Sequence, residues 1–288
     1  MSVPVMTLLL DLLPRIPDSH IRGTDAYRSL ESALLREISS SEFGPEGSGI
    51  EELNGFGKLI FPYHSMGNIS SLHLFGLDEI ILFSYYRALR AKYRRVADLG
   101  ANIGLHSIIM SKCGWEVVSF EPDPEHSKIL EQNFQANTLS SHELRQVAVA
   151  DHDGTMTFVR VKGNTTGSHL EGSKLNTYGD VDRFCVDVID VRKLSGNFDL
   201  LKIDIEGQEA KFLNRTEAPF WTTTDAFMEV GSSANRDSVF ESIDRLSVEA
   251  YSQKIGWRRV KYKVDLPEHH SEGSVFLTSH SGSPRNFV

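Results

Sequence analysis

From Arg95 onward, short apolar runs alternate with segments whose apolar residues recur at helical spacing. The runs typical of strands are RRVADL, EVVSF, LRQVAVA, TMTFVRV, RFCVDVIDV, FDLLKID and TDAFMEV. Helical patterns fill 104–113, 124–137, the run EGQEAKFL and 236–253. This alternation predicts an α/β fold, a mostly parallel sheet with helices on both faces. An antiparallel pair, 255–263 and 273–278, is expected to close the sheet.

The segment before the alternating region has another pattern. Its first residues, MSVPVMTLLLDLLPR, predict an amphipathic helix rather than a signal peptide, because no basic residue precedes the apolar stretch and Asp11 interrupts it. Residues 39–49 are rich in Ser, Gly and Pro and predict a joint. We therefore expect an N-terminal helical extension over 1–75, a candidate cover or dimer arm, and a main α/β domain over 76–288.

Composition narrows the class of protein. The 288 residues include 30 Lys and Arg against 39 Asp and Glu, a net charge of −9, which argues against sequence-independent nucleic-acid binding. Two cysteines, Cys113 and Cys185, cannot form a disulfide framework, so a reducing, cytoplasmic compartment is the simplest interpretation. No apolar run approaches the ~20 residues that a membrane-spanning helix needs.

A glycine turn follows the first strand of the alternating region. It reads Asp98-Leu-Gly100-Ala-Asn102-Ile-Gly104, and glycines at such a turn let a ligand approach the backbone closely. A dinucleotide fingerprint would have glycine at the positions of Asn102 and Leu105, so a pyrophosphate is disfavoured. An uncharged or cationic adenosine derivative remains compatible. The alternative is a plain helix start with Gly100 in a strained turn.

Acidic residues end three strands of the predicted sheet. Glu121 follows the second strand at the spacing expected of a carboxylate that accepts ribose hydroxyls; the alternative is an exposed loop glutamate. Asp204 ends FDLLKID, Glu206 lies two positions further on, and Glu229 ends the next strand. Either Asp204 or Glu206 is expected to cap the helix that follows. The strand ends holding Asp204 and Glu229 predict a small acidic pocket.

Three other features have weaker implications. The 11 histidines show no zinc spacing, so no metal site is predicted; His106, just after the glycine turn, is a candidate general base, although single histidines more often serve packing. The basic run 257–263 is interpreted as a solvated strand face. The alternative is that it binds an anionic group of the substrate. The polar loop 163–169 is a candidate lid.

Four separated blocks occur in order: VADLGANIGLHSIIM, VVSFEPDPEHSKILEQN, VAVADHDGTMTF and DLLKIDIEGQEAKFL. Together they resemble the FkbM family of S-adenosylmethionine-dependent methyltransferases, and the resemblance runs from about 76 to 288. It implies a class I, Rossmann-like methyltransferase fold, with a seven-stranded sheet whose last strand is antiparallel. It also implies O-methylation of a hydroxyl on a sugar, a glycan or a natural product.

Carried over by motif, the resemblance implies roles for particular residues. The methionine and sulfonium side of S-adenosylmethionine would be lined by Asp98, Gly100, Asn102 and Gly104. Glu121 would hold the ribose, Ala148 would lie against adenine, and Asp151 follows it. The candidates for the catalytic edge are Asp204 and Glu229, with Glu206 and His106 behind them.

Two alternatives stay open from the sequence. One is a nicotinamide-dependent oxidoreductase acting on a nucleotide-sugar, against which the missing middle glycine argues. The other is a cofactor-binding partner protein that does not catalyse. The expected partner is a small-molecule or glycan acceptor, without nucleic acid or a membrane span, and a homodimer is left open. The acceptor's identity cannot be obtained from these residues.

Overall fold

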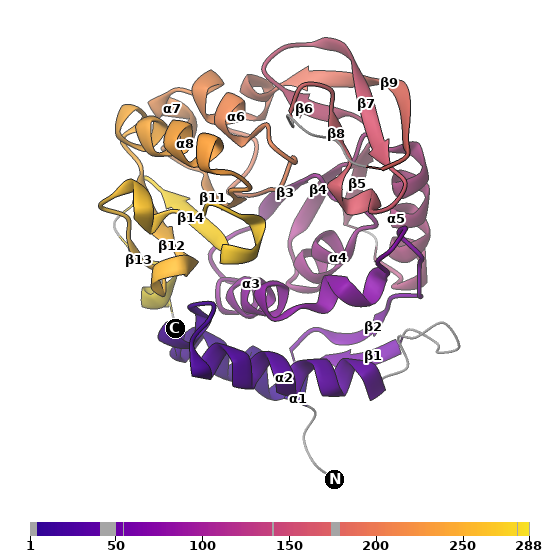
Figure 1. Cartoon of the computed structure of the whole chain (residues 1–288), viewed down its shortest axis with the longest axis vertical. Coiled ribbons are helices and arrows are strands. Elements are labelled where there is room, and N and C mark those ends of the chain that lie inside the picture. The colour runs from indigo at the N-terminus through magenta and orange to yellow at the C-terminus, as the bar shows by residue number, and fades with distance from the viewer. Residues whose placement is uncertain are drawn as a thin grey trace.

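The structure is a computed structural model that describes residues 5–40, 50–53, 55–139, 141–173, 179–280 and 282–287. Most of the predicted joint at 39–49 therefore lies outside the described residues. The main sheet has the strand order β13-β12-β14-β11-β10-β3-β4-β5 (Figure 1). In chain order its strands are β3 (Arg95–Leu99), β4 (Glu116–Phe120), β5 (His142–Arg145), β10 (Leu200–Ile203), β11 (Asp225–Glu229), β12 (Glu249–Ser252), β13 (Arg258–Arg259) and β14 (Ser274–Thr278).

The directions of the strands confirm the predicted fold class. Strands β5, β4, β3, β10 and β11 run parallel, and β14 inserts antiparallel between β11 and β12. These seven strands are the class I methyltransferase arrangement, in which the last long strand is antiparallel. The two-residue strand β13 adds an eighth by pairing with β12 at the sheet edge.

Helices cover both faces of the sheet because its strands alternate apolar residues between two cores. Val96 and Leu200 pack into one core, with α3 (Leu77–Ala88), α4 (Leu105–Lys112) and α5 (Pro124–Ala136). Ala97 and Leu201 pack into the other, with α6 (Glu209–Arg215), α7 (Ala218–Trp221) and α8 (Ser233–Leu246). The α3 face also carries Asp98 and Lys202, which are aligned on neighbouring strands.

A second sheet lies beside the end of the main sheet that carries β4 and β5 (Figure 1). Its order is β6-β9-β7-β8, from β6 (Ala148–Ala150), β7 (Gly154–Val161), β8 (His169–Leu170) and β9 (Val181–Asp190). The run LRQVAVA, expected as one strand, is divided between the two sheets, since β5 ends at Arg145 and β6 begins at Ala148.

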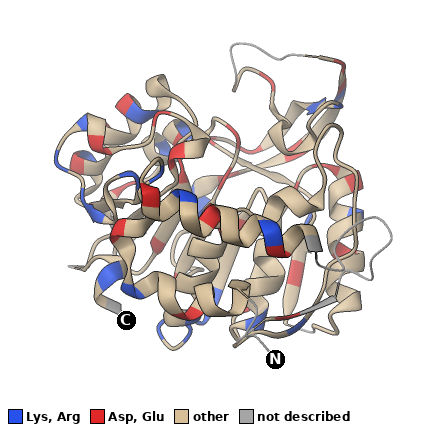
Figure 2. Cartoon of the chain, turned by 60° about the horizontal axis from the view of Figure 1, so that its bottom comes forward, with Lys and Arg blue, Asp and Glu red and all other residues tan. Residues whose placement is uncertain are grey.

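The N-terminal extension packs beneath α3 in Figure 1. It contains α1 (Val5–Leu12), α2 (Asp25–Ser40) and the hairpin of β1 (Ile50–Leu53) and β2 (Gly57–Ile60). The amphipathic helix is confirmed: α1 buries Met6, Leu9 and Leu10. Acidic and basic residues are interspersed along the helices of this face (Figure 2).

A buried histidine joins the extension to the C-terminal part of the chain. His20 has no exposed surface, and its ring nitrogens bond the carbonyl of Leu13 at 2.9 Å and the indole N–H of Trp257 at 2.8 Å. Burial lowers the pKa of His20 to about 4, so the ring is neutral at pH 7. Among the described residues, no helix has the length and apolar content that a bilayer-spanning segment requires.

Two predictions near the C-terminus are wrong. The helix expected over 236–253 ends at Leu246, because Ser247 adopts a left-handed conformation with φ 55°, and β12 follows. The partner of β14 is β12 rather than 255–263. Glu and Ala favour a helix locally, but pairing with β14 and burial of Tyr251 outweigh that preference.

Candidate active site

The glycine turn after β3 contains two buried oxygen atoms without a protein donor. Asp98 is fully buried, and its Oδ2 atom accepts a 2.6 Å hydrogen bond from the hydroxyl of Ser107. Its Oδ1 atom, and the Oδ1 atom of Asn102, have no hydrogen-bond partner among the described residues. A buried acceptor without a donor costs about 1–3 kcal/mol, so these atoms are suited to accept from a ligand.

The glycines of this turn are required by the packing of the chain itself. Gly100 has φ +79°, and a Cβ atom there would lie 1.9 Å from the carbonyl oxygen of Asp204. Gly104 has φ +92°, and a Cβ atom there would lie 2.8 Å from Cγ of Leu130. Close approach of a ligand to these glycines stays a prediction.

Glu121 ties the ends of β3 and β4 together. Its two carboxyl oxygens accept hydrogen bonds from the backbone N–H of Asn102 at 2.7 Å and of Asp123 at 2.8 Å. The side chain is 4% exposed, so the alternative of an exposed loop glutamate is wrong. Burial raises the pKa of Glu121 to about 8, although the two backbone donors act in the opposite direction.

Sequence reasoning missed the support of this loop by the second sheet. Arg160, on β7, donates to both carboxylate oxygens of Asp123, at 2.6 Å from Nε and 2.5 Å from Nη2. Asp123 also caps α5 by accepting from the backbone N–H of Glu125 at 2.8 Å. The geometry makes Asp123, and through it the Glu121 loop, dependent on a strand far away in the sequence.

The remaining residues proposed for the adenine side lie at the start of the second sheet. Ala148 is buried and begins β6. Asp151 follows β6 with a side chain 45% exposed, and it accepts from Nδ1 of His152 at 2.7 Å. The candidate lid loop is hydrogen-bonded to the segment before α3: Thr165 N donates to Met66 O at 3.1 Å, and Asn68 N to Gly163 O at 2.7 Å.

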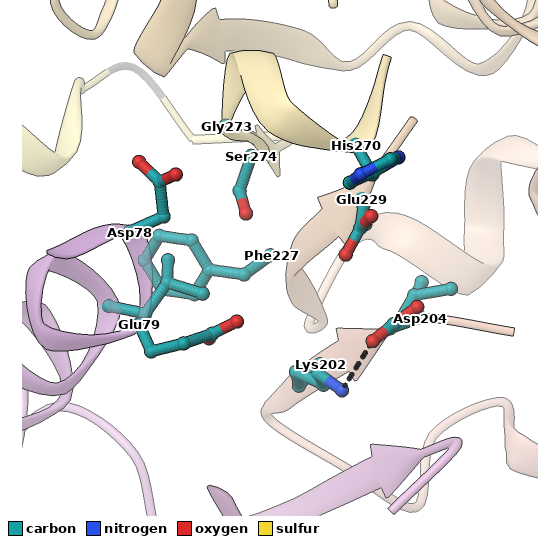
Figure 3. Close-up of a pocket in the computed structure, with 11 residues that line it drawn as sticks. Asp78, Glu79, Lys202, Asp204, Phe227, Glu229, His270, Gly273 and Ser274 are labelled. Atoms are coloured by element: carbon teal, nitrogen blue, oxygen red, sulfur yellow. Dashed lines mark hydrogen bonds and ion pairs between the residues drawn. The ribbon is translucent and has the colours of Figure 1, made fainter. Parts of the chain in front are cut away.

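A cavity lies where the carboxyl ends of β10 and β11 meet the first turn of α3 and the start of β14 (Figure 3). Asp204 and Glu229 both line it, so the structure brings together the two residues expected to form an acidic pocket. The described residues that line the cavity are Asp78, Glu79, Leu82, Lys202, Ile203, Asp204, Phe227, Glu229, His270, Gly273 and Ser274.

The charged groups of the cavity differ in their protonation. Lys202 Nζ lies 3.1 Å from Oδ2 of Asp204 and 3.7 Å from Oδ1 of Asp98. Burial lowers the pKa of Lys202, but the carboxylates of Asp204, Asp98 and Glu79 outweigh burial and hold it well above its usual range. Burial, then the negative charges of Asp204, Glu206 and Glu79, raise the pKa of Glu229 well above that of a free glutamate. Lys202 is therefore charged at pH 7, and the surroundings of Glu229 favour its protonated form.

Neither Asp204 nor Glu206 caps the helix that follows, so that prediction is wrong. The N-cap residue of α6 is Gln208, and the acid that organises the loop is Glu209. Its carboxylate accepts from the backbone N–H groups of Ile205 and Gly207 at 3.1–3.2 Å and from Asn235 Nδ2 at 2.6 Å. Glu206, with φ 52°, lies outside the described residues that line the cavity.

His106 also lies outside the cavity lining but touches a residue that is part of it. Its Nε2 atom is 2.7 Å from Oε2 of Glu79, and its Nδ1 atom is 3.0 Å from the hydroxyl of Tyr86. Sequence reasoning missed Asp78 and Glu79. Two adjacent acids at the start of a predicted helix were visible, but nothing local shows that α3 crosses the ends of β10 and β11.

Asp78 connects the cavity to the N-terminal extension. It accepts from Arg22 at 2.9 Å and from Gln253 at 2.6 Å. Burial raises its pKa to about 6, against the hydrogen bonds that it accepts. In the basic run, Trp257 is buried, Arg258 pairs with Asp18 at 2.9 Å and Arg259 with Glu249 at 3.3 Å, which agrees with a solvated strand edge.

The described residues contain no group of three or more His, Cys, Asp or Glu side chains arranged to hold a metal ion. The cofactor implied by the fold fits the residues present on two grounds. The turn after β3 offers two buried acceptors without donors, and Glu121 lies at the end of the adjacent strand. Both are at the carboxyl edge of the sheet, where α/β folds bind ligands.

The strand order and this site define a class I methyltransferase. The sequence profile of the Methyltransferase FkbM domain matches residues 98–253, which is more than half of the chain. The chain thus belongs to the FkbM methyltransferase family. No curated protein matches the sequence.

Several solved structures are similar to this chain at low identity. Monomeric WbdD is 13% identical with a TM-score of 0.40, and the match covers 70% of this chain and 41% of that one. Ribosomal protein L11 methylase from Lactobacillus delbrueckii subsp. bulgaricus is 11% identical, with a TM-score of 0.38 and coverage of 67% and 75%. Precorrin-6y C5,15-methyltransferase from Geobacter metallireducens GS-15 is 10% identical, with a TM-score of 0.38 and coverage of 69% and 86%. The chain thus spans less than half of the WbdD chain.

Proposed function

We propose that this methyltransferase uses S-adenosylmethionine to methylate a hydroxyl group of a sugar, a glycan or a natural product. The observation that carries the proposal is the junction of two sites. The Oδ1 atom of Asp98 accepts no hydrogen bond from the described residues but forms an ion pair with Nζ of Lys202 at 3.7 Å, and Lys202 lines the cavity of Asp204 and Glu229. A cofactor held on the glycine turn would therefore adjoin an acceptor held in the cavity.

The cofactor would be bound by the residues at the carboxyl edge of β3, β4 and the start of β6. Asp98 and Asn102 each have an oxygen atom that accepts no hydrogen bond from the described residues and can accept one from its ammonium group, beside Gly100 and Gly104. Glu121 has oxygens with remaining lone pairs for the ribose hydroxyls. The adenine side is assigned to Ala148, with Asp151 beyond it. When bound, the cofactor supplies a methyl group on a sulfonium, which is already a strong electrophile.

The task of the chain is then to position the acceptor and to exclude water. Alignment of two reactants can supply ~7–11 kcal/mol of barrier reduction. The Lys202–Asp204 ion pair fixes one wall of the cavity. The raised pKa of Glu229 favours its protonated form, which can donate a hydrogen bond to the acceptor from another wall. We assign Asp204 and Glu229 to orientation of the acceptor, with Glu206 behind them.

We propose that residues 1–75 act as a cover for this site, with the methyltransferase domain over 76–288. The support is the ion pair between Arg22 of the extension and Asp78 of the cavity. The buried contact of His20 with Trp257 holds the same segment against the domain.

Calorimetric titration with S-adenosylhomocysteine, with NADH as the control, tests the proposal. We expect micromolar binding of S-adenosylhomocysteine and none of NADH. Binding of NADH alone would support the oxidoreductase alternative. Binding of S-adenosylhomocysteine without transfer of labelled methyl to any acceptor would support a non-catalytic partner protein. Failure to bind either compound would overturn the assignment of the glycine turn and Glu121.

A further inference from the structure

An alcohol acceptor has to lose its proton during methyl transfer, and the carboxylates of the cavity are unequally suited to take it. Asp204 is bonded to the ammonium group of Lys202 at 3.1 Å, which stabilises its charge and weakens it as a base. Burial and neighbouring negative charges raise the pKa of Glu229 and so disfavour the charged form that a base needs. Asp78 is occupied by Arg22 and Gln253.

Among the cavity carboxylates of the described residues, Glu79 is the one held by a histidine rather than by Lys or Arg. It lies in the first turn of α3, and its side chain is 35% exposed. Figure 3 shows its carboxylate pointing from α3 into the cavity, toward Lys202 and Asp204. One of its oxygens is held by His106, and the other, which accepts no hydrogen bond from the described residues, can face an acceptor.

The contacts of His106 determine how it acts on Glu79. Burial raises the pKa of Tyr86 well above that of a free tyrosine, so its hydroxyl keeps its proton and can donate to Nδ1 of His106. With Nδ1 as the acceptor, the ring proton is on Nε2 and is donated to Glu79 across 2.7 Å. The ring also packs edge-on against Phe83, with centroids 4.9 Å apart. His106 is 13% exposed and is thereby fixed in orientation.

We propose that Glu79 is the general base for the acceptor hydroxyl and that His106 and Tyr86 are positioning residues that hold its carboxylate. The inference rests on the proposed function. In the step, the acceptor oxygen forms a bond to the methyl carbon and the carbon–sulfur bond breaks, leaving its electron pair on sulfur. The hydroxyl proton passes to Glu79 and then to solvent. The acceptor is thus a neutral alcohol that the enzyme deprotonates.

Charged and titratable side chains from several helices and strands face Glu79. They are Asp78 on α3, His106 on α4, Lys202 and Asp204 at the end of β10, Glu229 on β11 and His270 before β14.

The test compares methyl transfer from labelled S-adenosylmethionine to a panel of methyl glycosides and phenols by wild type, Glu79→Gln and Glu116→Gln. Glu116 is an exposed carboxylate at the opposite edge of the sheet, paired with Arg95, and serves as the matched control. We expect Glu79→Gln to lower kcat by about 10²–10⁴-fold. It should leave the affinity for S-adenosylhomocysteine within about twofold of wild type, because Glu79 lies on the acceptor side of the cavity.

Variants of His106 distinguish a positioning role from a purely structural one. His106→Gln retains an N–H donor for Glu79 and should keep most of kcat, whereas His106→Ala should lower kcat with little change in the acceptor's KM. Nitrogen NMR of labelled histidine gives a readout independent of turnover. We expect the neutral Nε2–H tautomer for His106 and a changed Nε2 resonance in Glu79→Gln.

Three results would overturn the inference. They are an unchanged kcat in Glu79→Gln, an Nδ1–H tautomer of His106, and tight binding of S-adenosylhomocysteine with no transfer to any alcohol of the panel. Absence of S-adenosylhomocysteine binding by the wild-type protein would instead overturn the proposed function, so the two failures are distinguishable.

Discussion

A Cβ atom on residue 100 would lie 1.9 Å from the carbonyl oxygen of Asp204, so the loops after β3 and β10 meet backbone to backbone at Gly100. The candidate cofactor turn and the candidate acceptor edge are therefore parts of one packed unit. Because Gly100 also has φ +79°, both conformation and space exclude a larger residue.

Gly100→Ala should destabilise the fold by more than about 3 kcal/mol, because one of the two loops has to move in addition to the left-handed strain. Gly114→Ala is the matched control: Gly114 has φ +89°, but a Cβ atom there meets nothing within 4 Å. It should cost about 1 kcal/mol. Urea denaturation of both variants measures the difference, and equal losses would show that the contact with Asp204 is relieved cheaply.

Arg160→Lys should weaken binding of S-adenosylhomocysteine by about 5–20-fold, because an ammonium group cannot reproduce the two-oxygen contact that positions Asp123 and the Glu121 loop. Arg183→Lys is the control, since Arg183 lies on β9 of the same sheet in an exposed pair with Glu171 at 3.4 Å. Calorimetry gives both affinities. Equal affinities would mean that the second sheet does not support the cofactor site.

The free energy of unfolding should fall as the pH rises from 6.5 to 8. Folded Glu121 keeps its proton up to a pKa of about 8, whereas in the unfolded chain it ionises near 4.5, so the folded state binds more protons throughout this window. Glu121 alone should contribute a loss of about 1.5 kcal/mol. His20 acts in the opposite direction, but below pH 6.5, because its folded pKa is about 4.

Glu121→Gln should flatten this dependence by the contribution of Glu121, whatever its effect on stability at a single pH. Denaturant melts at pH 6.5 and 8 on both proteins provide the comparison. The same slope in wild type and variant would show that Glu121 is ionised in the folded protein at pH 6.5.

Asp204→Ala should lower turnover on an acceptor by at least about 100-fold while the free energy of unfolding changes by less than about 1 kcal/mol. The side chain is 28% exposed and its removal leaves Lys202 close to Asp98, so the fold retains a partner for the buried ammonium group. Asp244→Asn, on the exposed side of α8, is the control for charge removal. Near-wild-type turnover in a folded Asp204→Ala protein would remove Asp204 from the catalytic edge.

Features that depend on short stretches of sequence could be predicted. The strand–helix alternation indicates a parallel sheet, and in such a sheet the carboxyl ends of the strands share one edge. For that reason the sequence alone suffices to place Asp98, Glu121, Asp204 and Glu229 at one edge of the sheet. The four blocks in order resemble the FkbM family, and the family match confirms that resemblance.

Features that depend on distant partners were not predictable. Residues 249–252 have local helix preference and become a strand because β14 is there to pair with them. LRQVAVA divides because β6 pairs with β9, some 40 positions further on. Arg160 contacts Asp123, and Glu79 contacts His106, only because the separate elements that carry them pack together in the folded chain. Local pattern thus determined the class of fold and the acids at the strand ends. Long-range packing depends on surfaces that meet only in the folded chain. It decided which side chains lie beside these acids, shift their pKa values and fix their orientation.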